Sequence, residues 1–375
     1  MSRVFFYVQH LLGIGHLRRA AVLARALVAG GFDVLLVSGG APVEGLALGG
    51  VRFYQLPPLR AADESLRDLA RLDGSPVDEA FRRQRTEALL GLLRAEAPDV
   101  VLTEQFPFGR TRLRFELMPL LEAARGRSLI ACSVRDVVRR AAPERVAEAV
   151  ELLDRFDAVL IHGDPRLVPF ERSFAGWARI KERAFYTGYV SERDLAQGMQ
   201  GAEGKDEVVV SVGGGAVGAP LLKAAIAARP KTALADRTWR LLLGENLPAQ
   251  DRAALACEEG IIVEPARPDF TTLLGNATLS ISQAGYNTTI ETLRCADRAV
   301  LVPFATERET EQGDRAQALA ERGMVAVVPP GTLSAQSLAD AVGRTLAGPS
   351  LKSFPPCDID GGAKTAALLH RLLVR

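Results

Sequence analysis

Short apolar segments alternate with amphipathic segments along the whole chain, and this alternation limits the fold more than any other feature. Segments such as Val4–Val8 and Asp33–Ser38 have the length and composition of buried strands. Between such strands, Leu17–Ala29, Glu79–Ala95 and Pro143–Asp154 have the apolar spacing of helices. Apolar strands that alternate with helices form parallel sheets covered on both faces. The sequence therefore predicts an α/β protein with doubly wound sheets. The other expected strands are Val51–Tyr54, Val100–Thr103, Ser128–Ser133, Ala158–His162, Glu207–Val212, Trp239–Leu243, Ile261–Glu264, Leu279–Ser282, Ala299–Val302 and Val325–Val328.

The length of 375 residues suggests two domains, at roughly 100–200 residues each. The segment Phe185–Val190 has the character of a crossover, and a polar, glycine-containing stretch follows it before the alternation restarts at Glu207. We expect an N-terminal domain over 1–190, a C-terminal domain over 191–361, and a final helix within 362–375 that packs back on the N-terminal domain. Two such domains facing one another would place the carboxyl ends of both sheets on one cleft, where ligands bind open α/β sheets.

Composition narrows the class of protein. The formal net charge of +1 indicates no nucleic-acid partner. The four cysteines form no CxxC pair, which favours a reducing cytoplasm over a disulfide framework or a zinc site. No apolar run reaches the roughly 18 residues of a membrane-spanning helix, and the N-terminus lacks the layout of a signal peptide. We therefore expect a cytoplasmic protein.

A glycine turn follows the first expected strand, with the sequence Gly13-Ile14-Gly15-His16-Leu17-Arg18-Arg19. Glycine lets a ligand approach the backbone, and the helix that follows offers unpaired N–H groups. His16 stands at the start of that helix with a side chain that titrates near neutral pH. The turn predicts a ligand site with Gly13, Gly15 and Arg18 beside His16. A tight turn whose histidine only caps the helix would have the same sequence pattern, so this alternative stays open.

Two further turns follow strands in the second half. Gly213, Gly214 and Gly215 come directly after an apolar strand, and three successive glycines can form a nest for phosphate. The third turn runs from Ser282 to Glu291 and opens another helix whose N-terminus favours anions. Neither turn carries the GxGxxG fingerprint or a GxxxxGK[ST] loop, so a nicotinamide cofactor and ATP hydrolysis are poorly supported.

Together these turns resemble the glycosyltransferases related to the lipid-intermediate N-acetylglucosaminyltransferase of peptidoglycan synthesis. Within that group, the chain is similar to predicted bacterial glycosyltransferases that begin with a GxGHxxR turn. The most specific part is Ser282 to Arg315, which combines an SxxGxNTxxE turn, the run Leu301–Phe304, and Glu309–Ala316. The resemblance implies a GT-B fold and an inverting transfer, without a catalytic metal or other cofactor, from a UDP-sugar to a hydroxyl acceptor.

The resemblance also implies roles for individual residues. Glu291 would hold the ribose, and Glu311 and Gln312 would contact hydroxyls of the donor sugar. The uracil would lie near Arg267. The pyrophosphate would be cradled by the third turn, with Gly213–Gly215 nearby; the residues of that turn are Ser282, Gly285, Tyr286, Asn287 and Thr288.

The chain departs from the family pattern on the acceptor side. The loop Thr103–Arg110 lacks the glycine-rich sequence of the peptidoglycan enzyme, so the acceptor is expected to be another hydroxyl compound, either lipid-linked or a cell-envelope or secondary-metabolite glycan. A general base must take the proton of that hydroxyl. His16 is the first candidate and Glu104 the second, whereas His162 is expected to be structural.

Three alternatives stay open at this stage. The protein could hydrolyse a UDP-sugar instead of transferring the sugar, or it could be a nucleotide-sugar-binding subunit that needs a partner. The basic, amphipathic stretch from Phe106 to Leu121 could also rest weakly on the inner face of the membrane.

Overall fold

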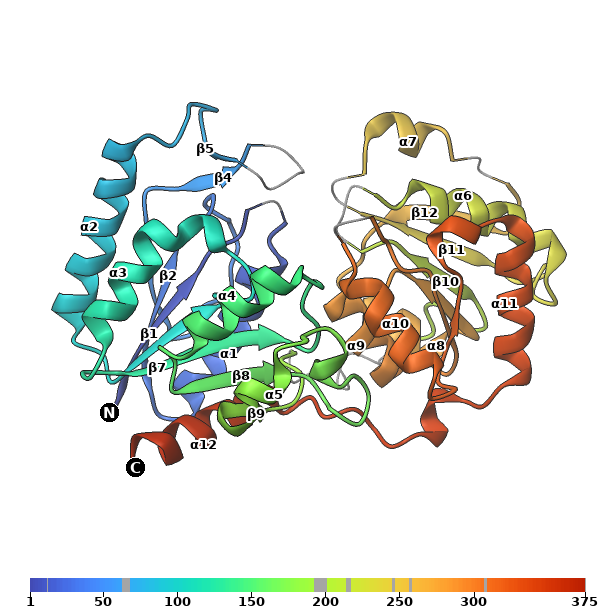
Figure 1. Cartoon of the computed structure of the whole chain (residues 1–375). Coiled ribbons are helices and arrows are strands. Elements are labelled where there is room, and N and C mark those ends of the chain that lie inside the picture. The colour runs from blue at the N-terminus through green and yellow to red at the C-terminus, as the bar shows by residue number, and fades with distance from the viewer. Residues whose placement is uncertain are drawn as a thin grey trace. The chain divides into compact units, whose positions relative to one another are not determined.

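The computed structural model describes residues 1–11, 13–62, 68–191, 201–213, 217–244, 247–255, 258–306 and 309–374. The chain divides into two compact units. The first unit comprises Met1–Pro165, Pro169–Ser191 and Asp358–Arg375, and the second comprises Arg166–Val168 and Glu192–Cys357 (Figure 1). Each unit contains its own parallel sheet, so the predicted α/β class is confirmed.

The first unit is built on a seven-stranded parallel sheet with the order β3-β2-β1-β6-β7-β8-β9. Side chains of a strand alternate between the two faces, and β1 shows the consequence. Val4 and Phe6 join the core cluster on one face, whereas Phe5 and Tyr7 join the cluster on the other. The strands are β1 (Arg3–Val8), β2 (Asp33–Ser38), β3 (Arg52–Gln55), β6 (Val100–Glu104), β7 (Leu129–Arg135), β8 (Ala158–His162) and β9 (Ala184–Tyr186).

Helices cover both faces of this sheet. Helices α1 (Gly15–Ala29) and α12 (Gly361–Leu373) pack against one another on the face of Val4 and Phe6. The opposite face is covered by α2 (Glu79–Glu96), α3 (Arg114–Ala124) and α4 (Pro143–Leu153). The C-terminal segment thus returns to the first unit, where both termini lie (Figure 1). The smaller elements are β4 (Leu59–Ala61) and β5 (Leu69–Arg71), which pair antiparallel, and α5 (Trp177–Ile180).

The second unit is built on a six-stranded parallel sheet with the order β12-β11-β10-β13-β14-β15. Helices α6 (Ala219–Ala228) and α11 (Ala335–Ala347) pack their apolar sides on one face of it. The strands are β10 (Val208–Ser211), β11 (Trp239–Leu243), β12 (Ile261–Pro265), β13 (Leu279–Ser282), β14 (Ala299–Leu301) and β15 (Ala326–Val327). The remaining helices are α7 (Ala249–Ala253), α8 (Phe270–Asn276), α9 (Tyr286–Cys295) and α10 (Glu311–Ala320).

Both sheets reverse their strand order at one place. In the first unit the reversal lies between β1 and β6, and in the second it lies between β10 and β13. Loops that leave these neighbouring strands diverge to opposite sides, which opens a crevice at their carboxyl ends where ligands bind. We call these two places the first and second switch points.

The crossover after β9 is fixed by the returning C-terminal segment. Gly188 has φ of +90°, and a Cβ built there would lie 2.6 Å from Oδ1 of Asp358. The backbone N–H of Tyr189 donates to the carbonyl of Asp358 at 2.7 Å. The position therefore requires glycine both for its backbone conformation and for space.

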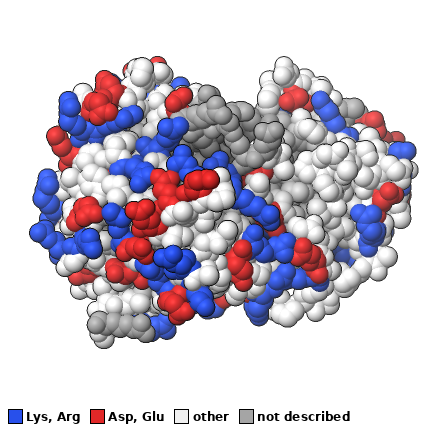
Figure 2. Space-filling view, viewed as in Figure 1, with Lys and Arg blue, Asp and Glu red and all other residues white. Residues whose placement is uncertain are grey.

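Apolar side chains of residues 106–121, the stretch considered for a weak membrane contact, pack into the first unit. Phe106, Leu113 and Leu117 are fully buried, and Phe108, Phe115 and Met118 are partly buried against the same core. Acidic and basic side chains are interspersed on the face of the first unit in Figure 2. Among the described residues, no helix has both the length and the apolarity needed to cross a membrane.

Candidate active site

The first switch point brings His16 and Glu104 into contact. Helix α1 begins at Gly15 without a side-chain cap, which places His16 in its first turn, and Glu104 is the last residue of the neighbouring strand β6. Nδ1 of His16 lies 3.0 Å from Oε1 of Glu104, and the two side chains are 16% and 0% exposed. Among the described residues, a Cβ built at Gly13 or Gly15 would meet nothing within 4 Å beyond its chain neighbours, so both glycines border open space.

Arg19 completes the charge pairing of Glu104. It lies one turn after His16 on α1, is buried, and donates to the carboxylate oxygen that also faces His16. Burial alone would raise the pKa of Glu104, but the attraction of Arg19 and the hydrogen bond from His16 outweigh it and hold that pKa far below the usual range. Glu104 is therefore a carboxylate at every physiological pH.

The environment of His16 favours its neutral form. Burial lowers its pKa well below the ordinary value, Arg135 and Arg110 lower it further, and Glu104 opposes them only in part. A neutral imidazole beside an ionised carboxylate carries its proton on the nitrogen that faces it, here Nδ1. Nε2 then holds the lone pair, and Nη2 of Arg135 lies 3.3 Å from it.

A chain of buried hydrogen bonds supports the other oxygen of Glu104. Oγ of Ser133 lies 2.9 Å from Oε2 of Glu104 and 2.9 Å from Nε2 of His162. Nδ1 of His162 lies 2.8 Å from Oγ1 of Thr187, and burial lowers the pKa of His162 to about 3. With His162 neutral, Oγ1 of Thr187 can donate to Nδ1 of His162, Nε2 of His162 can donate to Oγ of Ser133, and Ser133 can donate to the carboxylate of Glu104. A satisfied buried network of this kind fixes the geometry of its members.

The second switch point brings the other two glycine turns together. Gly213 follows β10 with φ of +64°, and a Cβ built there would lie 3.7 Å from Oγ1 of Thr288. Gly285 is the N-cap of α9, so no side chain caps this helix, and a Cβ built at Gly285 would meet no described residue within 4 Å beyond its chain neighbours. Oε1 of Gln312 accepts from the backbone N–H of Ala284 and of Phe304, each at 3.0 Å. The side chain of Gln312 thereby joins the third turn to the loop after β14.

Two charged residues complete this region. Arg315 is buried on α10, donates to the carbonyl of Ala284 at 2.8 Å, and places its guanidinium 5.8 Å from the ring centroid of Tyr286. Glu291 lies on α9, where burial raises its pKa from 4.5 to about 7. Within the described part of the chain, Glu291 makes no hydrogen bond or ion pair that would offset this burial. Its carboxyl group is thus suited to a ligand that donates hydrogen bonds.

The structure places the remaining expected residues as follows. Ser282 is buried beneath the third turn, Asn287 lies in the first turn of α9, and Glu311 is the first residue of α10. Arg18 is exposed on α1 and does not reach Glu104, so the motif arginine that matters in this geometry is Arg19. Gly214 and Gly215 lie outside the described residues.

Arg267 is not brought to the second switch point. It follows β12, the edge strand, and its guanidinium is paired with Asp269 at 2.7 Å and with Glu264 at 3.4 Å. Sequence reasoning assigned no site role to Arg19, Ser133 or Arg315, and it gave His162 and Arg135 structural roles only. Arg19 had a usable signal, because it is the arginine of the GxGHxxR pattern and a spacing of three residues puts it on the same helix face as His16.

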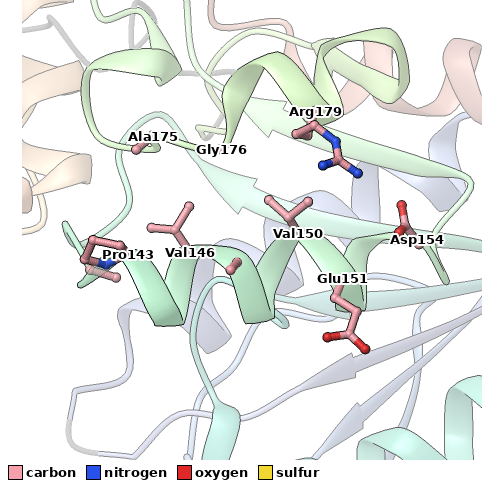
Figure 3. A pocket seen from close by; sticks show the side chains of 10 residues that line it. Pro143, Val146, Val150, Glu151, Asp154, Ala175, Gly176 and Arg179 are labelled. Carbon is pink, nitrogen blue, oxygen red and sulfur yellow. The ribbon is translucent and has the colours of Figure 1, made fainter.

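Another hollow of the first unit lies away from these residues. It is an open groove of about 500 Å³ along α4, lined on one side by Val146 and Val150 and on the other by Ala175, Gly176 and Arg179 (Figure 3). None of the expected site residues lines it. Among the described residues, no group of three or more His, Cys, Asp or Glu side chains is placed to hold a metal ion.

Comparisons with known proteins identify the fold. Residues 209–356 match the model of the glycosyltransferase family 28 C-terminal domain. No curated protein matches the chain.

Solved structures align along its whole length, among them the glycotransferase of kitacinnamycin, at 18% identity, 99% coverage of both chains and a TM-score of 0.68. MurG of Acinetobacter baumannii aligns at 18% identity, covering 99% of this chain and 100% of that one, with a TM-score of 0.64. The glycosyltransferase VinC, in complex with dTDP, aligns at 16% identity, 100% coverage of both chains and a TM-score of 0.63. The fold is GT-B, as predicted, and the family match supports a glycosyltransferase.

Proposed function

We propose that the protein is an inverting glycosyltransferase that moves a sugar from a nucleoside diphosphate donor, held by the second unit, to a hydroxyl acceptor activated by His16. The observation that carries the proposal is the contact between His16 and Glu104 at the first switch point. The family match over residues 209–356 supports a nucleotide-sugar donor on the second unit.

The donor is assigned to the second switch point. Gly213 and the first turn of α9 would hold the diphosphate through backbone N–H groups, since α9 begins at a glycine without a side-chain cap. The carboxyl of Glu291 would accept from the ribose hydroxyls. The amide nitrogen of Gln312, whose oxygen is already engaged, would donate to the sugar, with Glu311 beside it.

The base of the nucleotide is proposed to be a pyrimidine. Uridine follows from the family resemblance, whereas dTDP is the ligand named for VinC and thymidine diphosphate the ligand named for a spinosyn rhamnosyltransferase with a TM-score of 0.59. The loop after β12 would contact the base through its backbone, because the side chain of Arg267 is committed to Asp269 and Glu264.

His16 is proposed to be the general base. Its Nε2 takes the proton of the acceptor hydroxyl while that oxygen forms a bond to the anomeric carbon and the bond to the diphosphate oxygen breaks. Attack opposite the leaving group inverts the anomeric configuration. Glu104 stabilises the imidazolium that forms and fixes its orientation, as the carboxylate of a catalytic triad does. Glu104 itself is unsuited to be the base, because Arg19 holds its pKa too low to retain a proton.

The charge that develops on the leaving diphosphate is proposed to be stabilised by the N-terminus of α9 without a metal ion. Activity that persists in excess EDTA would agree with this, and activity that returns only with a divalent cation would contradict it. Because nucleotide sugars are cytoplasmic metabolites, we also propose a cytoplasmic location.

A thermal-shift series with UDP, dTDP, GDP and ADP tests the donor site. A ligand at 100 times its dissociation constant stabilises the fold by about 2.7 kcal/mol, which shifts the melting temperature by a few degrees. We expect a selective rise with pyrimidine nucleotides that Glu291→Ala removes. No rise with any nucleotide would refute the proposal. Product analysis then separates the alternatives, because a hydrolase releases free sugar without an acceptor, and a subunit turns over only with its partner.

A further inference from the structure

We propose that the acceptor carries an anionic group, a phosphate or a carboxylate, close to its reacting hydroxyl, and that this group binds Arg135 and Arg110 and so uncovers Nε2 of His16. The inference rests on the proposed function and names the class of acceptor for the same site.

Arg135 covers the atom that must accept the proton. It is the last residue of β7, the strand next to β6, and its Nη2 lies 3.3 Å from Nε2 of His16. With the proton of His16 on Nδ1, toward Glu104, the lone pair of Nε2 accepts from Arg135. An acceptor hydroxyl needs that same lone pair. Arg135 must therefore move its guanidinium to another partner before the base can work.

Arg110 places a second cation on the same side. Its Nε donates to the carbonyl of Gln9 at 2.7 Å, which fastens the arginine to the carboxyl end of β1 just before the first glycine turn. Arg110 has φ of +62° and Gln105, at the other end of the same loop, has φ of +67°. Non-glycine residues in this region of backbone space cost free energy and cluster at ligand sites. The strained loop and the bond to Gln9 thus fix the position of Arg110, whose charge acts on His16.

The charged groups around His16 explain why an anion would matter. Glu104 faces it from β6 but is shared with Arg19 on α1, while Arg135 and Arg110 act on it from β7 and from the loop. Both of these arginines oppose the imidazolium that must form during transfer. An oxyanion on the acceptor pairs with guanidinium groups, often through two hydrogen bonds, and offsets their charge. The base would then be strengthened only when the correct acceptor is bound.

The four histidines of the chain make a direct test practical, because imidazole signals of so few residues can be resolved by NMR. We would titrate the full-length protein, saturated with UDP to fill the donor site, with sodium sulfate as a phosphate probe and sodium acetate as a carboxylate probe. Sodium chloride at equal ionic strength is the reference. We expect one of the two probes to shift His16 and raise its pKa, leaving His162 and His370 unchanged.

Variants separate a specific site from general charge. Arg135→Gln should raise the pKa of His16 without any probe and weaken binding of the active probe by about 10-fold or more, as loss of a charged hydrogen bond does. Arg110→Gln should weaken binding in the same direction. Arg112→Gln, on the exposed side of the same segment, should change neither quantity.

Each outcome bears on one proposal. If UDP binds but neither probe moves His16, or if Arg112→Gln weakens binding as much as Arg135→Gln, the anionic acceptor is refuted and the proposed transfer stands. If UDP fails to bind, the proposed function fails, whatever the probes do. A probe effect that survives in both Arg135→Gln and Arg110→Gln would also refute the assignment.

Discussion

The two switch points have the same topology and opposite chemistry. At the first, His16, Glu104 and Arg19 already form a buried, hydrogen-bonded unit before any ligand is present. At the second, among the described residues, Gly285 borders open space and the partly buried Glu291 has no partner. The first arrangement fits the proposed proton transfer, whereas the second fits a site that a bound ligand completes. Substitutions should therefore separate rate from affinity according to which switch point they alter.

The largest effect is expected from His16→Gln. Loss of a positioned general base slows the chemical step by about 10²–10⁴-fold, while the affinity for nucleotide should stay within twofold because the proposed donor site belongs to the other unit. Rates of product formation and nucleotide dissociation constants, measured separately, check this. In the wild type, kcat/KM for the acceptor reports the free protein, in which the pKa of His16 lies well below 6.5, so this ratio should fall only well below pH 6.5.

If His16→Gln bound nucleotide poorly, the two switch points would not separate rate from affinity. If His16→Gln left the rate unchanged, the general base would have to be another residue.

Arg19→Ala is expected to be the most destabilising change at the first switch point. It leaves the buried carboxylate of Glu104 without its main counter-charge, a loss that costs about 3–5 kcal/mol. Arg18→Ala, one residue away and exposed, should change the free energy of unfolding by no more than about 0.5 kcal/mol. Urea unfolding of both variants provides the measurement. Equal effects would contradict the assignment of the motif arginine to position 19.

Arg18 and Arg19 illustrate which parts of the site could be predicted from the sequence and which could not. Strand positions could be predicted because parallel strands are short and apolar, and His16 and Glu104 because ligands bind at strand ends. Arg18 was chosen, although helix periodicity and the spacing of the GxGHxxR pattern both favour Arg19. The link of Ser133 and His162 to Glu104 could not be predicted, because it depends on β6, β7 and β8 being neighbours in the sheet.

Glu291→Gln should have opposite effects on stability and binding. Folding raises the pKa of Glu291 from 4.5 to about 7, so its contribution to stability is fully present below about pH 4.5 and is lost as the pH rises through 7. At pH 8 the ionised, buried carboxylate costs about 3 kcal/mol, which glutamine avoids. We expect the variant to unfold at higher urea concentration at pH 8, with little difference at pH 4.5.

Nucleotide-sugar affinity provides the second half of that test. Ribose hydroxyls donate to the carboxylate, so wild-type affinity should increase between pH 5.5 and 8, and Glu291→Gln should bind more weakly without this dependence. A variant that is destabilised at pH 8 would show that Glu291 already has a partner in the free protein.

The smallest effect distinguishes two glycines of the second switch point. Gly285 has φ of −62°, which alanine adopts without strain, but alanine is a poorer N-cap than glycine; these effects oppose one another, so Gly285→Ala should change stability by less than about 1 kcal/mol. Its new methyl group would enter space assigned to the diphosphate and weaken nucleotide binding by about tenfold, equivalent to about 1.4 kcal/mol. Gly213 has φ of +64°, so Gly213→Ala should cost about 1–2 kcal/mol of stability through backbone strain.

Thermal unfolding and nucleotide titration of the two variants would show whether the open space at Gly285 serves a ligand. If Gly285→Ala bound nucleotide normally, the diphosphate would have to lie elsewhere, and the contrast between a prebuilt site and a ligand-completed site would lose its second half.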